Sequence, residues 1–430
     1  MKYHLKTLGC AKNTVDSWRM ESALRSSGHI PSFDKQDADL LLVNTCGFID
    51  EASQESLDAI RDLDSNRGKN QQLWVAGCLT QIASERVKKE IPGVDHTFGA
   101  EEWDSIAMEL GPSEESYDIP AATMPGASVS AYLKISDGCD RPCTFCIIPK
   151  IKGRMKSDNQ QRLLAEARMH AYAGAKELVL IAQDTTAFGE DNKDKDGLAH
   201  LLEALSEAVP EVPWIRLMYA YPGKVTPKLA ETMSILPNIV PYVDMPLQHG
   251  SDATLRRMKR PSLRKANQSL ELLTNAMPEI ALRTTFIVGF PGETESEFLE
   301  LLDFIKEWKF DHIGAFSYSP QRGTPAFEHE GSVDSAVVAD RFSRLMTLAQ
   351  DISSSRTKDL VGERVEVLIE SEEPGENADG DLISIGRSFR DAPEVDGMAF
   401  VKGVFKPGEI VPTVVKGALP YDLLCYPASD

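Results

Sequence analysis

The sequence predicts an α/β protein in three parts: an N-terminal α/β domain with a parallel sheet, a central partial barrel of six parallel strands, and a small antiparallel β-barrel. At roughly 150 residues per domain, a chain of 430 residues suggests about three domains. Strand-like apolar runs alternate with helical patterns over most of the chain, which is typical of parallel sheets. The end of the chain instead carries short alternating runs. We place the domains at residues 1–125, 126–354 and 355–430.

Composition and charge exclude several classes of protein. Hydrophobic residues at 42% and charged residues at 26% are ordinary for a folded domain, so disorder, collagen-like repeats and coiled coil are excluded. The net charge of -20 disfavours non-specific electrostatic binding to nucleic acid or to an anionic membrane, and it favours a basic partner. No apolar run approaches the roughly 18 residues of a membrane span, and the first residues lack a signal-peptide stretch. We therefore expect a cytoplasmic protein with reduced thiols and no membrane contact.

Three of the seven cysteines lie at the ends of short apolar runs in the first hundred residues. They are Cys10, Cys46 and Cys78. Their separations of 36 and 32 residues are each about one strand-helix-strand unit. Because the carboxyl ends of parallel strands lie along one edge of a sheet, we expect the three thiols to converge on a soft metal site. The alternative is that they are three small buried hydrophobes.

A second group, Cys139, Cys143 and Cys146, forms a C-x3-C-x2-C run directly after a strand-like segment. Pro142 disfavours a helix here, so the segment should be a loop that wraps three sulfurs around one centre. Structural zinc normally takes four ligands, and no fourth cysteine lies nearby. Three ligands with one open position fit a four-iron cluster. Phe145 is either core filling or the wall of a cofactor pocket, and we expect the leftover Cys425 in a core.

Six strand-like runs with amphipathic helices between them make up the central part, and each run ends in polar or glycine residues. The runs are Tyr132–Ser136, Leu178–Ala182, Trp214–Met218, Val240–Met245, Leu282–Val288 and Ile313–Tyr318. In barrels of this kind the chemistry lies at the carboxyl ends of the strands. One helix is predicted at Glu295–Trp308, with a capping box from Thr294 and Glu297.

Five alternating runs after a long helical stretch predict the small closed β module. They are Arg364–Ile369, Leu382–Ile385, Met398–Val404, Ile410–Val415 and Tyr421–Cys425. Residues 357–430 carry seven Lys or Arg against fifteen Asp or Glu, a net charge of -8. Such a module should favour a Lys- and Arg-rich protein over a phosphate backbone. The alternative is that its acidic face is merely solvated.

The C-x3-C-x2-C spacing resembles the signature of the radical S-adenosylmethionine (SAM) enzymes. Together with the three upstream cysteines and the terminal β module, which is similar to the TRAM domain, the chain resembles the methylthiotransferases over essentially its whole length. Within that family it looks like the RimO-type branch, which modifies an aspartate of the small-subunit ribosomal protein S-twelve. The segments that carry this likeness are Leu8–Asn13, Val15–Ser17, Asn44–Asp50, Glu55–Ser56, Ser136–Arg141 and Ala392–Gly397.

The resemblance implies two 4Fe-4S clusters and SAM as cofactors. Cys139, Cys143 and Cys146 would hold the cluster that cleaves SAM, and the resulting radical would take a hydrogen from the β-carbon of the target aspartate. Cys10, Cys46 and Cys78 would hold the cluster that supplies sulfur. The resemblance further implies that Gln183 and Asp184 lie near the methionine end of SAM and that Arg216 and Gln248 line its cavity. We add Phe145 to these residues because it stands beside the last cysteine.

No side chain would act as a catalytic nucleophile, and a one-electron reductant such as a flavodoxin would supply electrons. Three other functions stay open at this point. A tRNA adenosine methylthiotransferase would use the same chemistry, but the charge argues against nucleic acid as the main partner. A non-catalytic iron–sulfur electron carrier would not need an open coordination position. A zinc-binding scaffold would need a fourth ligand.

Overall fold

The computed structural model describes residues 1–112, 129–376 and 380–428. The predicted boundary between residues 125 and 126 lies outside the described residues. The predicted boundary at 354/355 lies within helix α12 (Ser335–Asp359), which continues for five residues beyond Ser354. Within the described part of the chain, no helix combines the length and apolarity that a membrane crossing requires.

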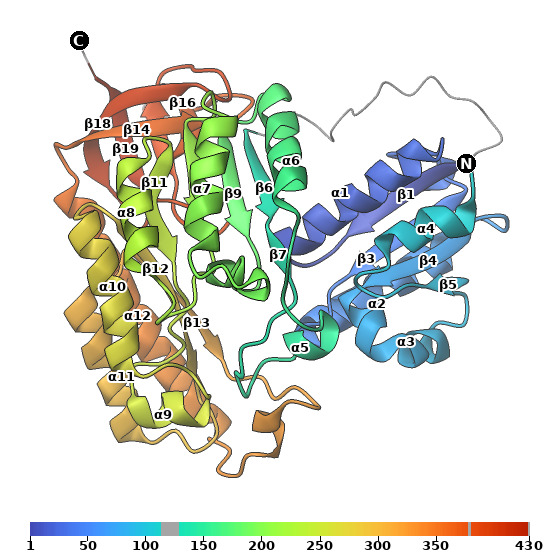
Figure 1. Cartoon of the computed structure of the whole chain (residues 1–430), viewed down its shortest axis with the longest axis horizontal. Helices are drawn as coiled ribbons and strands as arrows, with labels where there is room; N and C mark the ends of the chain where they lie inside the picture. The colour runs from blue at the N-terminus through green and yellow to red at the C-terminus, as the bar shows by residue number, and fades with distance from the viewer. Residues whose placement is uncertain (113–128, 377–379, 429–430) are drawn as a thin grey trace.

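The N-terminal domain is a five-stranded parallel sheet with helices α1–α4 packed around it (Figure 1). The strand order is β2-β1-β3-β4-β5, and the strands are β1 (Lys2–Thr7), β2 (Ile30–Pro31), β3 (Leu40–Thr45), β4 (Gln72–Gly77) and β5 (His96–Thr97). The helices are α1 (Ala11–Ser26), α2 (Asp50–Asn66), α3 (Cys78–Glu90) and α4 (Trp103–Leu110). Strands β1, β3 and β4 are adjacent, so the loops that follow them lie side by side.

The central domain is a parallel six-stranded sheet of order β13-β12-β11-β10-β9-β6, which confirms the predicted partial barrel. Its strands are β6 (Ser130–Lys134), β9 (Glu177–Ile181), β10 (Trp214–Leu217), β11 (Ile239–Asp244), β12 (Ala281–Val288) and β13 (His312–Ser317). The covering helices are α6 (Gln160–Tyr172), α7 (Gly197–Ala208), α8 (Pro227–Ile235), α10 (Leu263–Ala276), α11 (Glu295–Trp308) and α12. Helix α11 has the predicted bounds and the predicted capping box.

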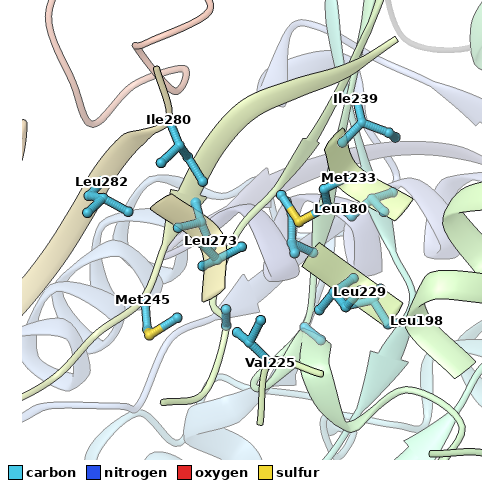
Figure 2. Packing of buried hydrophobic residues seen from close by; sticks show 14 of the residues in the cluster. Leu180, Leu198, Val225, Leu229, Met233, Ile239, Met245, Leu273, Ile280 and Leu282 are labelled. Carbon is cyan, nitrogen blue, oxygen red and sulfur yellow. The ribbon is translucent and has the colours of Figure 1, made fainter. Parts of the chain in front are cut away.

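Two short pieces interrupt this pattern near the cysteine loop. Strands β7 (Ser136–Asp137) and β8 (Lys156–Ser157) form a small antiparallel pair around it, and helix α5 (Ile148–Ile151) lies between them in the chain. Helix α9 (Asp252–Arg257) lies between β11 and α10. The main apolar core lies between the sheet and its helices, where leucines and methionines of α7, α8 and α10 pack on the strands (Figure 2).

The C-terminal domain is a closed barrel of five strands, as predicted. The strands are β14 (Arg364–Ile369), β16 (Leu382–Ser388), β17 (Ala399–Lys402), β18 (Ile410–Ala418) and β19 (Leu423–Pro427), and the β14–β16 pairing closes the ring. A two-residue strand, β15 (Gly375–Glu376), extends β16. One pair, β17 with β19, is parallel, because the chain crosses over between them instead of making a hairpin. Cys425 is fully buried in this barrel, as expected.

Candidate active site

The N-terminal cysteines occupy equivalent places at the carboxyl edge of the sheet. Cys10 caps helix α1, Cys46 directly follows β3, and Cys78 directly follows β4 as the first residue of α3. Gly9 has a φ of +93°, and a Cβ on it would lie 2.7 Å from the Cβ of Cys46. The loop that carries Cys10 therefore packs directly against Cys46, and only glycine fits at this approach.

These three thiols are close enough for their charges to interact. Burial first, and the charges of Cys46 and Cys10 in addition, raise the pKa of the Cys78 thiol to about 12, although Lys152 opposes this. Burial and the charge of Cys10 raise the pKa of Cys46. The three thiols thus lie near enough to influence one another, and their role as metal ligands stays a prediction. A bound metal ion or cluster would have to displace protons from these thiols, because thiolates are the metal-binding form.

The second triad lies on the loop between β7 and α5. Gly138 has a φ of +72°, and a Cβ on it would lie 2.1 Å from the carbonyl oxygen of Arg154, so the loop turns sharply before its first cysteine. The backbone amide of Cys139 donates to the carbonyl of Gly153 at 3.1 Å, and the amide of Cys146 donates to the carbonyl of Cys143 at 3.2 Å. These bonds fold the loop around its three sulfurs.

Donors and charges surround these three sulfurs. The backbone amide of Arg141 donates to the sulfur of Cys139, and Nη1 of Arg260 donates to the sulfur of Cys143, both at 3.5 Å. Burial, with added repulsion from Cys143 and Cys139, raises the pKa of Cys146 to about 12. Burial likewise raises the pKa of Cys139. Hydrogen bonds to sulfur stabilise thiolates and tune the potential of an iron–sulfur cluster.

A buried charge network connects the two triads. Asp16 and Asp137 each pair with both Lys134 and Lys152, and Nζ of Lys152 lies 2.9 Å from Asp16 and 3.2 Å from Asp137. Although burial opposes it, the two lysines lower the pKa of Asp137 to about 2. Asp16 lies on α1 of the first domain, whereas Asp137 stands two residues before Cys139. Since the charge of Lys152 also acts on Cys78, this network lies between the two cysteine groups.

Gln183 and Asp184 follow β9 at the carboxyl edge of the barrel, as predicted. The side-chain oxygen of Gln183 is buried without a hydrogen-bond partner, so this site lacks a donor that a ligand can supply. Asp184 accepts hydrogen bonds from Nε of Arg141 at 2.6 Å and from the hydroxyl of Thr186 at 2.5 Å. This pairing ties the cysteine loop to the strand end.

The other three predicted cofactor residues have different surroundings. Gln248 has a φ of +73°, a strained conformation that occurs often at functional sites. Arg216 is fully buried, and its guanidinium donates to Glu177 at 2.6 Å and to the carbonyl of Phe389 at 2.6 Å. Phe145 packs against an apolar cluster that contains Phe290. Their contact with a cofactor stays a prediction.

The chemistry of the donors suits an iron–sulfur cluster, because the cysteine thiolates of each triad are the ligands that hold such clusters. Among the residues that the structure describes, no group of three or more His, Cys, Asp or Glu side chains is arranged to hold a single metal ion.

Several residues of this region were not identified from the sequence. Arg260 contacts Cys143 across 117 positions of chain, and no local pattern indicates such a pairing. Lys134 did leave a signal, because it is a charged residue within the predicted strand Tyr132–Ser136. The role of Lys152 depends on how the first two domains pack, which the sequence pattern does not report.

The three parts of the chain match three family models in the same order. Residues 2–99 match uncharacterized protein family UPF0004, residues 133–305 match the radical SAM superfamily, and residues 361–426 match the TRAM domain. Among solved structures, the chain is similar to the radical SAM methyltransferase TsrM from Kitasatospora setae, with a TM-score of 0.55 and 12% identity over 76% of this chain and 73% of that one. The cobalamin-dependent enzyme OxsB gives a TM-score of 0.53 and 13% identity over 81% and 56% of the two chains. At these identities the likeness shows the fold alone.

Curated relatives align with nearly the whole chain. The ribosomal protein uS12 methylthiotransferase RimO of Chloroflexus aurantiacus is 42% identical, covering 98% of this chain and 99% of the relative. The RimO of Roseiflexus sp. is 42% identical over 98% and 96% of the two chains, and that of Synechocystis sp. is 40% identical over 97% and 95%. An iron–sulfur cluster and SAM follow as cofactors from the radical SAM domain. The chain therefore belongs to the RimO family of methylthiotransferases and is a radical SAM enzyme.

Proposed function

We propose that the enzyme adds a methylthio group to the β-carbon of an aspartate in ribosomal protein uS12, and that it uses two four-iron clusters for this reaction. The observation that carries the proposal is the pair of cysteine triads, which lie on loops joined by the buried network of Asp16, Lys134, Asp137 and Lys152. A methylthio transfer needs two centres within reach of one substrate carbon, one to activate the carbon and one to supply sulfur.

In this proposal Cys139, Cys143 and Cys146 hold the cluster that binds SAM, and Cys10, Cys46 and Cys78 hold the second cluster. When bound, these groups would supply the 5'-deoxyadenosyl radical that removes a hydrogen from the aspartate and the sulfur that replaces it, and a second molecule of SAM would supply the methyl group. The chain itself supplies no nucleophile for this chemistry. Its residues bind, orient and shield the reacting groups.

Five residues form the proposed SAM site: Phe145, Gln183, Asp184, Arg216 and Gln248. The orphaned oxygen of Gln183 accepts a hydrogen bond from the SAM amino group in this proposal. In this proposal Asp184, which pairs with Arg141 at 2.6 Å, lies beside the sulfonium of SAM. Arg216 and Phe145 support the cavity by packing, since both are engaged with neighbouring residues.

The charge of the chain supports a basic protein substrate. The net charge is -20, and the C-terminal residues 357–430 alone carry a net charge of -8. Ribosomal proteins must neutralise RNA phosphates, so they are rich in Lys and Arg. Opposite charge steers such a partner onto the acidic surface. A cellular one-electron reductant such as a flavodoxin completes the proposal.

Mass spectrometry of the small-subunit proteins, from cells with and without this gene, tests the proposed target. We expect one aspartate of uS12 to gain a methylthio group only when the gene is present. The same gain on a tRNA adenosine, with uS12 unchanged, would contradict the proposed substrate but not the family.

A further inference from the structure

Lys12 reaches from the first domain to the mouth of the barrel. It lies in the first turn of α1, two residues after Cys10, and its Nζ stands 3.6 Å from the centre of the Tyr219 ring. Tyr219 follows β10 at the carboxyl edge of the barrel and has a φ of +59°, which is unusual for a large side chain. Its carbonyl accepts a hydrogen bond from the amide of Thr185, next to Asp184.

Lys12 differs in its partners from the other lysines between the first two domains. Lys134 and Lys152 each pair with both Asp16 and Asp137. For Lys12, no carboxylate of the described residues lies within ion-pair distance. A cation in the first turn also opposes the helix dipole, which favours anions there. The ammonium of Lys12 is therefore stabilised here by the ring of Tyr219 and not by a carboxylate or by the helix dipole.

The neighbours of Lys12 place its charge between the two triads. On one side it stands two residues from Cys10. On the other side it contacts Tyr219, and two residues further on Tyr221 contacts Cys143 through its hydroxyl. The ring face of Tyr219 stabilises the ammonium without using up its three hydrogen-bond donors. A substrate carbon that is activated at one triad and receives sulfur from the other has to come close to this ammonium.

We infer that Lys12 binds the side-chain carboxylate of the substrate aspartate. The inference rests on the proposed function and names the group that recognises the substrate there. A carboxylate that enters a site shielded from water needs a cation, because burial of an unpaired charge is strongly unfavourable. The ion pair would hold the carboxylate and thereby fix the adjacent β-carbon in place. An adenosine base has no anionic group, so the same lysine favours a protein substrate over a nucleobase.

The test compares binding of recombinant uS12 with binding of a uS12 variant whose target aspartate is asparagine. The reconstituted enzyme, Lys12→Gln, Lys12→Arg and the control Lys6→Gln are titrated with both proteins anaerobically. We expect the enzyme and the control to prefer the aspartate form about tenfold, as a charged hydrogen bond allows. Lys12→Gln should bind both forms equally, and Lys12→Arg should keep part of the preference. Lys6 is likewise half-buried and forms no ion pair with the described residues.

Iron content and cleavage of SAM to 5'-deoxyadenosine are measured on the same preparations. Both should be unchanged in Lys12→Gln, which a merely structural role of Lys12 would not allow. The inference is overturned if Lys12→Gln still prefers the aspartate form, or if it loses iron. If the proposed function is wrong, the result is different: the unchanged enzyme then binds the two forms of uS12 equally. That result would also overturn the inference about Lys12.

Discussion

Arg260 places a guanidinium beside the thiol of Cys143, at 3.5 Å from its sulfur, and stacks over Tyr221 with 4.2 Å between the guanidinium carbon and the ring centre. Its other Nη atom donates to the carbonyl of Pro246, so the side chain is held from two sides. A positive charge and a hydrogen bond at a cluster ligand stabilise the reduced, more negative form of a cluster. Arg260 is therefore expected to ease electron entry at the first site.

The change Arg260→Ala should lower the reduction potential of the cluster bound by Cys139, Cys143 and Cys146. The measurement is a redox titration of the reconstituted enzyme, followed by electron paramagnetic resonance. Arg264→Ala is the matched control, since Arg264 is exposed and forms no ion pair with the described residues. An unchanged potential in Arg260→Ala would show that the guanidinium does not act on the cluster.

Predictability from sequence differs between the residues of this site. The six cysteines were identified because strand ends and the C-x3-C-x2-C spacing are local patterns, and within each triad the thiols influence one another's pKa. Their role as cluster ligands stays a prediction. Lys12 and Arg260 were not singled out, because their partners come from other elements far along the chain. The sequence analysis predicted that Arg216 lines the SAM cavity. In the structure this residue forms a fully buried ion pair with Glu177.

Among the elements, those with strong local signals were predicted closely. Helix α11 has the predicted bounds because the apolar stripe and the capping box of Thr294 and Glu297 both mark it. Strand β6 ends two residues early, and Ser136 pairs with β8 instead, because the chain turns into the cysteine loop. Helix α3 begins directly after β4, so Cys78 occupies the first helical position.

Lys152 follows α5 and lies where α1, β6 and α5 meet. Its side chain is buried and pairs with Asp16 of one domain and Asp137 of the next. The change Lys152→Met leaves Asp16 and Asp137 with Lys134 alone in a dry site. We expect a loss of about 3 kcal/mol of folding free energy, measured by thermal unfolding.

Lys150→Met serves as the control for this change, since Lys150 lies on α5, two residues before Lys152, and is exposed. It should unfold within about 0.5 kcal/mol of the unchanged protein, as surface substitutions usually do. Equal stability of the Lys152 and Lys150 variants would mean that the network does not hold the two domains together.

At the scale of the whole molecule, the C-terminal barrel is attached to the central sheet by a second buried network. Glu177 of β9 pairs with Arg216 of β10 at 2.6 Å and with Arg387 of β16 at 2.5 Å. The three domains and their order follow from local patterns, but this attachment does not. Nor does the parallel β17–β19 pair, since strand pairing over this distance depends on tertiary packing.

This attachment should respond to acid. Burial alone raises the pKa of Glu177, but Arg216 and Arg387 lower it to about 2. A carboxylate with a lowered pKa stabilises the fold above its unfolded value of 4.5, and this contribution is lost as the pH falls from there toward about 2. Glu177→Gln should therefore lower the melting temperature by several degrees at pH 7, and the difference should shrink below pH ~4.5.

Melting curves of Glu177→Gln and the unchanged protein, recorded across this pH range, check the expectation. The exposed Glu300, which forms no ion pair with the described residues, provides the control Glu300→Gln. A difference that stays constant down to pH ~2 would show that the charge of Glu177 does not contribute to folding.

Iron content after anaerobic reconstitution tests most directly whether the six cysteines form two separate cluster sites. The proteins to compare are the unchanged enzyme, the triple variant Cys10→Ala/Cys46→Ala/Cys78→Ala and the triple variant Cys139→Ala/Cys143→Ala/Cys146→Ala. We expect about eight irons in the unchanged enzyme and about four in each variant, as two four-iron clusters require. About four irons in the unchanged enzyme and none in either variant would mean one shared cluster and would contradict the account.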